Sequence, residues 1–136
     1  MHENEIARQI VDAAYKVHST LGPGLLESAY QAILVYELQR RGLRIEAETP
    51  MLVVYEGIHL DIGFRADLIV EDKVIVELKS VEQIAPVHKK QLLTYLRLAD
   101  KRLGLLINFG APLIKDGITR IVNHLVEEPT QSRQER

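Results

Sequence analysis

Two acidic residues and a lysine lie on either side of a short polar turn within an aliphatic stretch. The segment FRADLIV-EDK-VIVELKS, residues 64–80, predicts a β-hairpin, because β-branched runs flank a polar triplet. If the turn centres on Asp72, Asp67 lies directly opposite Glu77, with β-carbons ~4.5–5.5 Å apart. The side-chain period of two then places Lys79 on the face of Glu77. Three ionised groups therefore converge on one face.

This grouping predicts a divalent-metal site. Two carboxylates at that distance repel each other unless a cation lies between them. Mg²⁺ takes one or two protein carboxylates and fills its other positions with water and phosphate oxygens. A nearby ammonium can position a water molecule or help to deprotonate it. Hydrolysis of a phosphodiester needs these parts together. An ordinary cross-strand ion network on a solvated sheet face is the alternative explanation.

A predicted helix over residues 86–99 directly follows the Glu77-Leu78-Lys79 strand. It carries His88, Gln91 and Tyr95 at positions i, i+3 and i+7, which share one helix face. Because the helix follows the strand directly, its N-terminal half can lie near Lys79. The alternative is a half-exposed helix face on which Tyr95 packs against the sheet.

Glu27 opens a second, largely apolar helix and shares a face with Tyr30 in the pattern Gly24-x-x-Glu27-x-x-Tyr30. A glutamate in a first turn also interacts favourably with the helix dipole, which explains Glu27 without any site.

Taken in this order, the motifs resemble the small bacterial GxxExxY proteins, which are grouped with the PD-(D/E)XK nuclease superfamily. The resemblance covers residues 5–123. It is carried by Gly24-Leu-Leu-Glu27-Ser-Ala-Tyr30, Arg65-Ala66-Asp67, Glu77-Leu78-Lys79, Gln91-x-x-x-Tyr95 and Leu105-Leu106-Ile107-Asn108-Phe109-Gly110. Ala66 stands where the superfamily's name-giving motif has proline.

The resemblance implies a role for each matching residue. Asp67, Glu77 and the backbone carbonyl of Leu78 would hold Mg²⁺ or Mn²⁺. Lys79 would orient the attacking water and stabilise developing charge. The resemblance also implies supporting roles for residues on two helices. Glu27 would be an accessory acid that bonds to a water at the site or to Lys79, and Gln91 and Tyr95 would support the site or contact the substrate phosphate.

Hydrophobic periodicity predicts helices at residues 5–21, 25–41 and 86–99. Asn4 is the expected cap of the first helix. The second is apolar almost all round between Ala29 and Tyr36, so it should be well buried. Strands are expected at 44–48, 51–56, 59–70, 74–80 and 103–109, whereas 118–123 fits a strand or a helix.

This order of elements favours an α/β (α+β) fold with one central mixed β-sheet flanked by helices. With the resemblance, it predicts a single restriction-endonuclease-like domain over residues 1–126. A polar C-terminal tail, residues 127–136, is expected to be disordered.

Composition narrows the class of protein. The 136 residues include no cysteine, which excludes disulfides, thiolate metal sites and cysteine nucleophiles. No apolar run approaches the ~20 residues that span a bilayer, so we expect a cytoplasmic protein without membrane contact. The net charge is −2, yet residues 79–102 hold six basic residues against two acidic ones, which permits a local basic surface or simply a solvated helix face.

The leading hypothesis is a metal-dependent nuclease that acts on nucleic acid, with DNA favoured over RNA. The rival is a nuclease-like fold that binds or assembles without catalysis. The presence of Lys79 favours the first, and the low basicity favours the second. A core of this size has little surface for gripping a duplex, which favours a homodimer through the 86–99 helix or the edge of the 103–109 strand.

Overall fold

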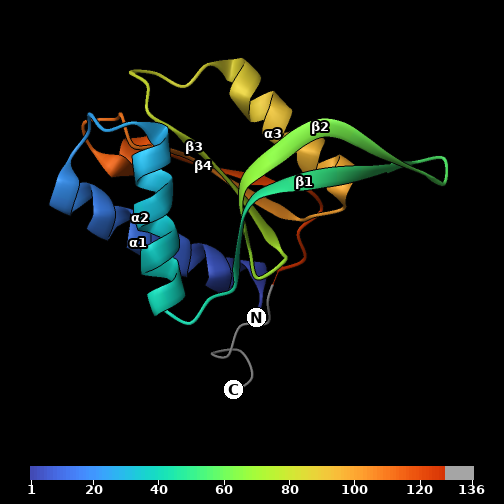
Figure 1. The fold of residues 1–136 in the computed structure, drawn as a ribbon, viewed down its shortest axis with the longest axis horizontal. Helices are drawn as coiled ribbons and strands as arrows, with labels where there is room; N and C mark the ends of the chain where they lie inside the picture. The colour runs from blue at the N-terminus through green and yellow to red at the C-terminus, as the bar shows by residue number, and fades with distance from the viewer. Residues whose placement is uncertain (128–136) are drawn as a thin grey trace.

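The computed structural model describes residues 1–127. Within these residues, five strands form one mixed sheet in the order β1-β2-β3-β4-β5 (Figure 1). Only β3 and β4 run parallel; the other neighbours are antiparallel. The elements are α1 (Glu3–Leu21), α2 (Glu27–Arg40), β1 (Ile45–Tyr55), β2 (Ile58–Val70), β3 (Val74–Lys79), α3 (Pro86–Ala99), β4 (Leu103–Asn108), the short 3₁₀-helix η1 (Ile114–Gly117) and β5 (Ile118–Val122). The expected central mixed sheet flanked by helices is confirmed.

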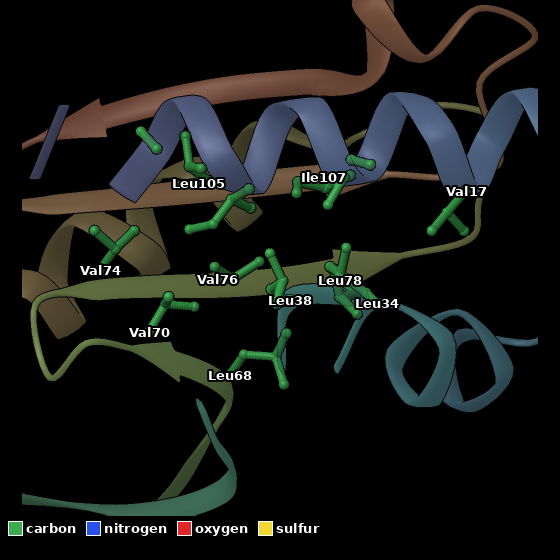
Figure 2. Close-up of a cluster of buried hydrophobic side chains, with 14 of the residues drawn as sticks. Val17, Leu34, Leu38, Leu68, Val70, Val74, Val76, Leu78, Leu105 and Ile107 are labelled. Carbon is green, nitrogen blue, oxygen red and sulfur yellow. The ribbon is translucent and has the colours of Figure 1, made fainter. Parts of the chain in front are cut away.

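Helices cover both faces of the sheet. On one face, α1 and α2 pack on the even-numbered side chains of β2 and β3 and the odd-numbered ones of β4, as Figure 2 shows for Leu68, Val76 and Ile107. On the other face, α3 places Leu92 and Leu96 against a smaller cluster. Side chains of β3 therefore alternate between two buried environments, which explains its nearly continuous apolar sequence.

Helix α1 follows its predicted pattern with one difference at its start. Its apolar residues at helical spacing are buried except for Leu21; the buried ones are Ile6, Ile10, Ala13 and Val17. The expected cap at Asn4 is wrong: the ring nitrogen Nδ1 of His2 accepts a hydrogen bond from the backbone N–H of Asn4 at 2.9 Å. His2 therefore takes the N-cap position, and the helix begins at Glu3.

Helix α2 is less buried than predicted. Tyr30, Leu34 and Leu38 are fully buried on one face, but Tyr36 is 62% exposed. The apolar residues on the outer face therefore remain in contact with solvent, where Tyr36 lies under the guanidinium of Arg40. The sequence shows apolar residues all round, but the sheet offers a surface to only one side of the helix.

Strand β1 is one continuous strand, where two were predicted. The predicted break falls at Thr49 and Pro50, and a register shift follows between Pro50 and Leu52. Proline lacks a backbone N–H, and it is tolerated here because β1 is an edge strand.

The β2–β3 hairpin has the predicted turn and register. Val70 pairs with Val74, Ile69 with Ile75, and Leu68 with Val76, so paired residue numbers sum to 144. The turn is made by residues 71–73, in which Glu71 and Asp72 adopt positive φ angles of 54° and 55°.

At the C-terminal end, residues 118–122 form a strand, which resolves the strand-or-helix ambiguity. Strand β4 lies between β3 and β5, and all six of its residues are buried. The expectation that the 103–109 strand offers an edge for dimerisation is therefore wrong. The predicted tail, apart from Glu127, lies outside the described residues. Among residues 1–127, no helix is both long and apolar enough to cross a bilayer.

Candidate active site

The sheet forks where the three predicted residues lie. The last regular pair between β2 and β3 is Leu68 with Val76. Beyond it β3 continues along β4, where Glu77 pairs with Leu106 and Lys79 with Asn108. The two strands separate one position beyond this pair, and we call this point the fork. Asp67 of β2 and Glu77 of β3 are the first residues at the fork.

At the fork, the two carboxylates replace the backbone ladder. Oε2 of Glu77 accepts a hydrogen bond from the backbone N–H of Asp67 at 3.1 Å. Oδ2 of Asp67 accepts one from the backbone N–H of Leu78 at 2.8 Å. Each carboxylate is thus fixed to the opposite strand through one oxygen. The other oxygens, Oδ1 and Oε1, accept no hydrogen bond from a backbone N–H within residues 1–127, and the two carboxyl groups lie close enough to hydrogen-bond to each other.

The backbone of Leu78 faces the same opening. Its N–H points to β2, and the N–H and C=O of one strand residue project to the same side. Its carbonyl oxygen therefore opens toward Asp67, whereas its side chain is buried in the core. This geometry supports Leu78 as a backbone ligand.

Lys79, the last residue of β3, is half-buried. It lies two residues beyond Glu77 and four beyond Ile75. Ile75 packs in the smaller buried cluster, on the side of the sheet that α3 covers. The period of two places all three on that face. Within the described residues, its ammonium forms no ion pair, although its charge acts on Glu77. Lys79 thus stays free to act on a third group.

Burial, and after it the negative charge of Asp67, raise the pKa of the Glu77 carboxyl to about 8, while the charge of Lys79 opposes the shift. Without a bound cation, the pair therefore holds an extra proton near neutral pH. A cation between the two carboxylates would favour their ionised forms and so lower this pKa.

This shift predicts a pH-dependent stability. The pKa of Glu77 is higher in the folded state than its ordinary value of 4.5, so the folded state binds more protons between pH 4.5 and about 8. Its contribution to the free energy of unfolding should therefore decrease as pH rises through this window. In chelator, Glu77→Gln should melt close to wild type near pH 4.5 and at a higher temperature than wild type near pH 8. A difference in Tm that stays constant across the window would contradict the assignment.

The Gly24-x-x-Glu27-x-x-Tyr30 segment forms a fixed loop before α2. Tyr30 is fully buried and stacks on Phe109, with ring centroids 4.4 Å apart. Its hydroxyl donates to the carbonyl of Gly22 and accepts from the N–H of Leu25. Gly24 adopts φ +114°, a conformation that other residues rarely reach. The tyrosine and the glycine are thus explained by the shape of the loop.

Glu27 is brought to the end of β3 by this loop. Oγ of Ser80, the residue after Lys79, donates a hydrogen bond to the carbonyl of Leu25 at 2.7 Å. Glu27 is exposed and lines a surface hollow of about 350 Å³ together with Ser80. It comes from the α1/α2 layer, while Lys79 projects on the α3 side. Its role as accessory acid stays a prediction.

The predicted residues of α3 have different surroundings. Gln91 is exposed. Tyr95 is half-buried and stacks on Phe64 of β2, with ring centroids 3.5 Å apart. The side chain of His88 accepts a hydrogen bond from the N–H of Ala85, so it caps the start of α3. Tyr95 holds the helix against the strand that carries Asp67, and Gln91 is open to a ligand.

Sequence reasoning assigned no role to Asn108, which fixes the connection after Lys79. Asn108 is 2% exposed and pairs with Lys79 in the sheet. Its Oδ1 accepts from the N–H groups of Val81 and Gly110, and its Nδ2 donates to the carbonyl of Val81. A β-carbon at Gly110 would lie 2.3 Å from that carbonyl oxygen. The available signal in the sequence was a lone polar residue at the end of an apolar strand, two positions before Gly110.

We expect Asn108→Ala to lower the free energy of unfolding by about 2–4 kcal/mol, because three backbone groups lose their partner in a half-buried region. Asn123→Ala is the matched control, since Asn123 is also buried and its side chain forms one hydrogen bond, to the carbonyl of Lys101. Urea denaturation measures both. Equal losses of unfolding free energy for the two variants would count against a special role for the hydrogen bonds of Asn108.

The donor set suits a hard divalent cation. It offers two carboxylates and a backbone carbonyl, which are oxygen ligands of the kind that Mg²⁺ and Mn²⁺ prefer. Within the described residues, no group of three histidine, aspartate or glutamate side chains could hold a metal ion. Within these residues Glu27 therefore forms no common ligand group with Asp67 and Glu77.

Comparison of the sequence with models of protein families identifies the family of this chain. The family model described as PD-(D/E)XK nuclease superfamily matches residues 4–121. The chain belongs to the PD-(D/E)XK nuclease superfamily. Its five-stranded mixed sheet with flanking helices, within the described residues, is consistent with a restriction-endonuclease-like domain of this superfamily. The match does not test the finer resemblance to the GxxExxY proteins, which stays a prediction. Comparisons with curated proteins and with solved structures find no match.

Proposed function

We propose that the chain hydrolyses phosphodiester bonds in nucleic acid, with DNA as the favoured polymer. The observation that carries this is the fork, where Asp67 and Glu77 are each fixed by the backbone of the opposite strand beside Lys79. Such fixing holds catalytic groups in place before the substrate arrives. Membership of a nuclease superfamily supports the same activity.

Asp67, Glu77 and the carbonyl of Leu78 would hold Mg²⁺ or Mn²⁺. When bound, such an ion polarises the scissile phosphate and lowers the pKa of water. Lys79 would orient the attacking water through its ammonium and stabilise charge that develops on the phosphate.

The residues of α3 would contact the substrate. Lys89, Lys90 and Gln91 are exposed on its N-terminal half, where phosphates of a polymer could reach them. Tyr95 would act indirectly by holding Phe64 and β2 in place. Glu27 would bond to a water at the site or to Lys79.

A non-catalytic binding module is the second candidate, favoured by the net charge of −2. A panel of labelled single-stranded, duplex, flap and junction DNA, with matched RNA, separates the two. We expect cleavage of DNA with Mg²⁺ or Mn²⁺ and none in chelator. Binding without cleavage under every metal would favour the module, and preferential cleavage of RNA would overturn the choice of polymer. For the compartment we propose the cytoplasm, in keeping with the absence of cysteine.

A further inference from the structure

Beyond Pro50, β1 and β2 continue as a two-stranded arm that projects from the rest of the sheet (Figure 1). We call residues 52–62 the distal hairpin. Paired residue numbers change from a sum of 115 at Pro50 and Arg65 to 113 at Leu52 and Asp61. The shift arises because β2 has more residues than β1 between these two pairs, which makes a β-bulge. Gly63, with φ +76°, is one of these residues. The bulge separates the distal hairpin from the strands that carry the site.

One face of the distal hairpin is apolar throughout. Tyr55 pairs with Ile58 and Val53 with Leu60, and directly paired residues share a face. Ile62 lies two residues beyond Leu60 and follows the same alternation. Val53 is buried, but the other four are 44–61% exposed. These five residues form what we call the apolar strip.

The arm has few partners of its own. Within the described residues, β1 is the first strand of the sheet, and β2 pairs with β3 only over residues 68–70. Both edges of the distal hairpin are therefore unpaired. A two-stranded hairpin is marginally stable unless another layer covers it, and unpaired edges readily recruit another chain.

Charge indicates the class of partner. The distal hairpin contains two acidic residues, Glu56 and Asp61, and neither lysine nor arginine. Phosphates would meet repulsion there, because nucleic-acid binding relies on basic side chains. An uncharged apolar strip instead complements a second apolar strip, and its own copy provides one by two-fold symmetry.

The area is compatible with such a contact. The four exposed side chains of the strip present on the order of 400 Å² of apolar surface. A two-fold contact doubles this to on the order of 800 Å². This lies below the ~1,200 Å² at which stable interfaces begin, so the contact should be weak and should depend on concentration.

We propose that the distal hairpin is a self-association surface, at which the apolar strip packs against the strip of a second copy of this chain. This location replaces the strand edge of residues 103–109, which is buried inside the sheet. It also lies apart from Asp67 and Glu77, so association and cleavage can be altered separately.

The test is sedimentation velocity over a range of concentrations for wild type, Ile58→Lys and Leu60→Lys. Both positions are exposed, so the fold should survive, and circular dichroism checks this. Wild type should dimerise, and each lysine should raise the dissociation constant of the dimer at least ~10-fold, because it places like charges opposite each other. Leu113→Lys, 56% exposed on the loop before η1, is the matched control and should dimerise as wild type does.

A cysteine cross-link provides a second readout that needs no loss of stability. The chain has no cysteine, so Ile58→Cys introduces a unique thiol. A short bismaleimide should link Ile58→Cys into dimers far more efficiently than Leu113→Cys. Three outcomes overturn the proposal: wild type monomeric at every concentration, dimers unaffected by either lysine, or equal cross-linking of the two cysteine variants. A lysine change that alters affinity for duplex DNA but not sedimentation also overturns it, in favour of a nucleic-acid contact.

Discussion

Asp67→Asn is expected to abolish both cleavage and the stabilisation by Mg²⁺ or Mn²⁺. Asparagine can still accept the hydrogen bond from the N–H of Leu78, so the hairpin should remain folded. It removes one of the two negative charges that would hold the ion. The rate should fall by more than the ~10⁴-fold that a single positioned acid or base contributes, because the remaining groups cannot supply the chemistry of the ion.

Thermal unfolding with increasing Mg²⁺ or Mn²⁺ measures the binding part of this prediction. A ligand that binds only the folded state raises stability by about 2.7 kcal/mol at 100 times its dissociation constant. Asp72→Asn is the control, since Asp72 is an exposed carboxylate on the same hairpin, paired with Lys101. Wild type and Asp72→Asn should show the same shift and Asp67→Asn none. Equal shifts for Asp67→Asn and wild type would contradict a metal site at the fork.

Lys79→Ala is expected to slow cleavage by about 10²–10⁴-fold while preserving metal binding. The ammonium of Lys79 forms no ion pair within the described residues, so its removal should cost little stability. Lys79→Arg keeps the positive charge but cannot give up a proton. Substantial activity in Lys79→Arg would indicate that the charge alone matters, whereas activity as low as in Lys79→Ala would indicate proton transfer or exact placement.

Lys90→Ala separates substrate binding from chemistry. Lys90 is exposed on α3, so its removal should weaken binding and flatten its salt dependence because fewer counterions are released. The rate at saturating substrate should stay near that of wild type. A Lys79 variant that changed only binding, as Lys90→Ala should, would refute the assigned role.

The position of the candidate site was predictable from sequence because one local feature sets it. The residues around Asp72 favour a turn, and the turn fixes which residues face each other. Extending that register by one position brings Asp67 and Glu77 together, although the regular pairing ends at Leu68 with Val76 and the two do not form a ladder pair. Alternation then places Lys79, because β3 is regular up to its last residue.

The fork itself was not predictable, because it depends on contacts between distant segments. Nothing in the sequence of β2 shows that its pairing with β3 stops at Leu68. The hydrogen bonds of Asn108 were likewise not predictable, because they join it to Val81, 27 residues earlier in the sequence. The place of Glu27 depends on the contact between Ser80 and Leu25, which joins segments 55 residues apart.

Burial on both faces agrees with the apolar sequence of β3, whereas apolar sequence does not predict which side of a helix is covered. The sheet lies between two layers, so an apolar run such as that of β3 is buried on both faces. A helix has one sheet-facing side, and apolar composition does not reveal whether anything covers the other. Tyr36 remains exposed for this reason, whereas the distal hairpin is exposed because it projects beyond the layers that cover the sheet.

The most direct test of the account is single-turnover cleavage of the best DNA substrate from the panel by wild type, Asp67→Asn and Lys79→Ala, purified in parallel. Wild type should cleave the substrate with Mg²⁺ or Mn²⁺, Lys79→Ala should cleave it about 10²–10⁴-fold more slowly, and no cleavage should occur with Asp67→Asn or in chelator. Activity that survives both substitutions undiminished would place the chemistry elsewhere and contradict the account.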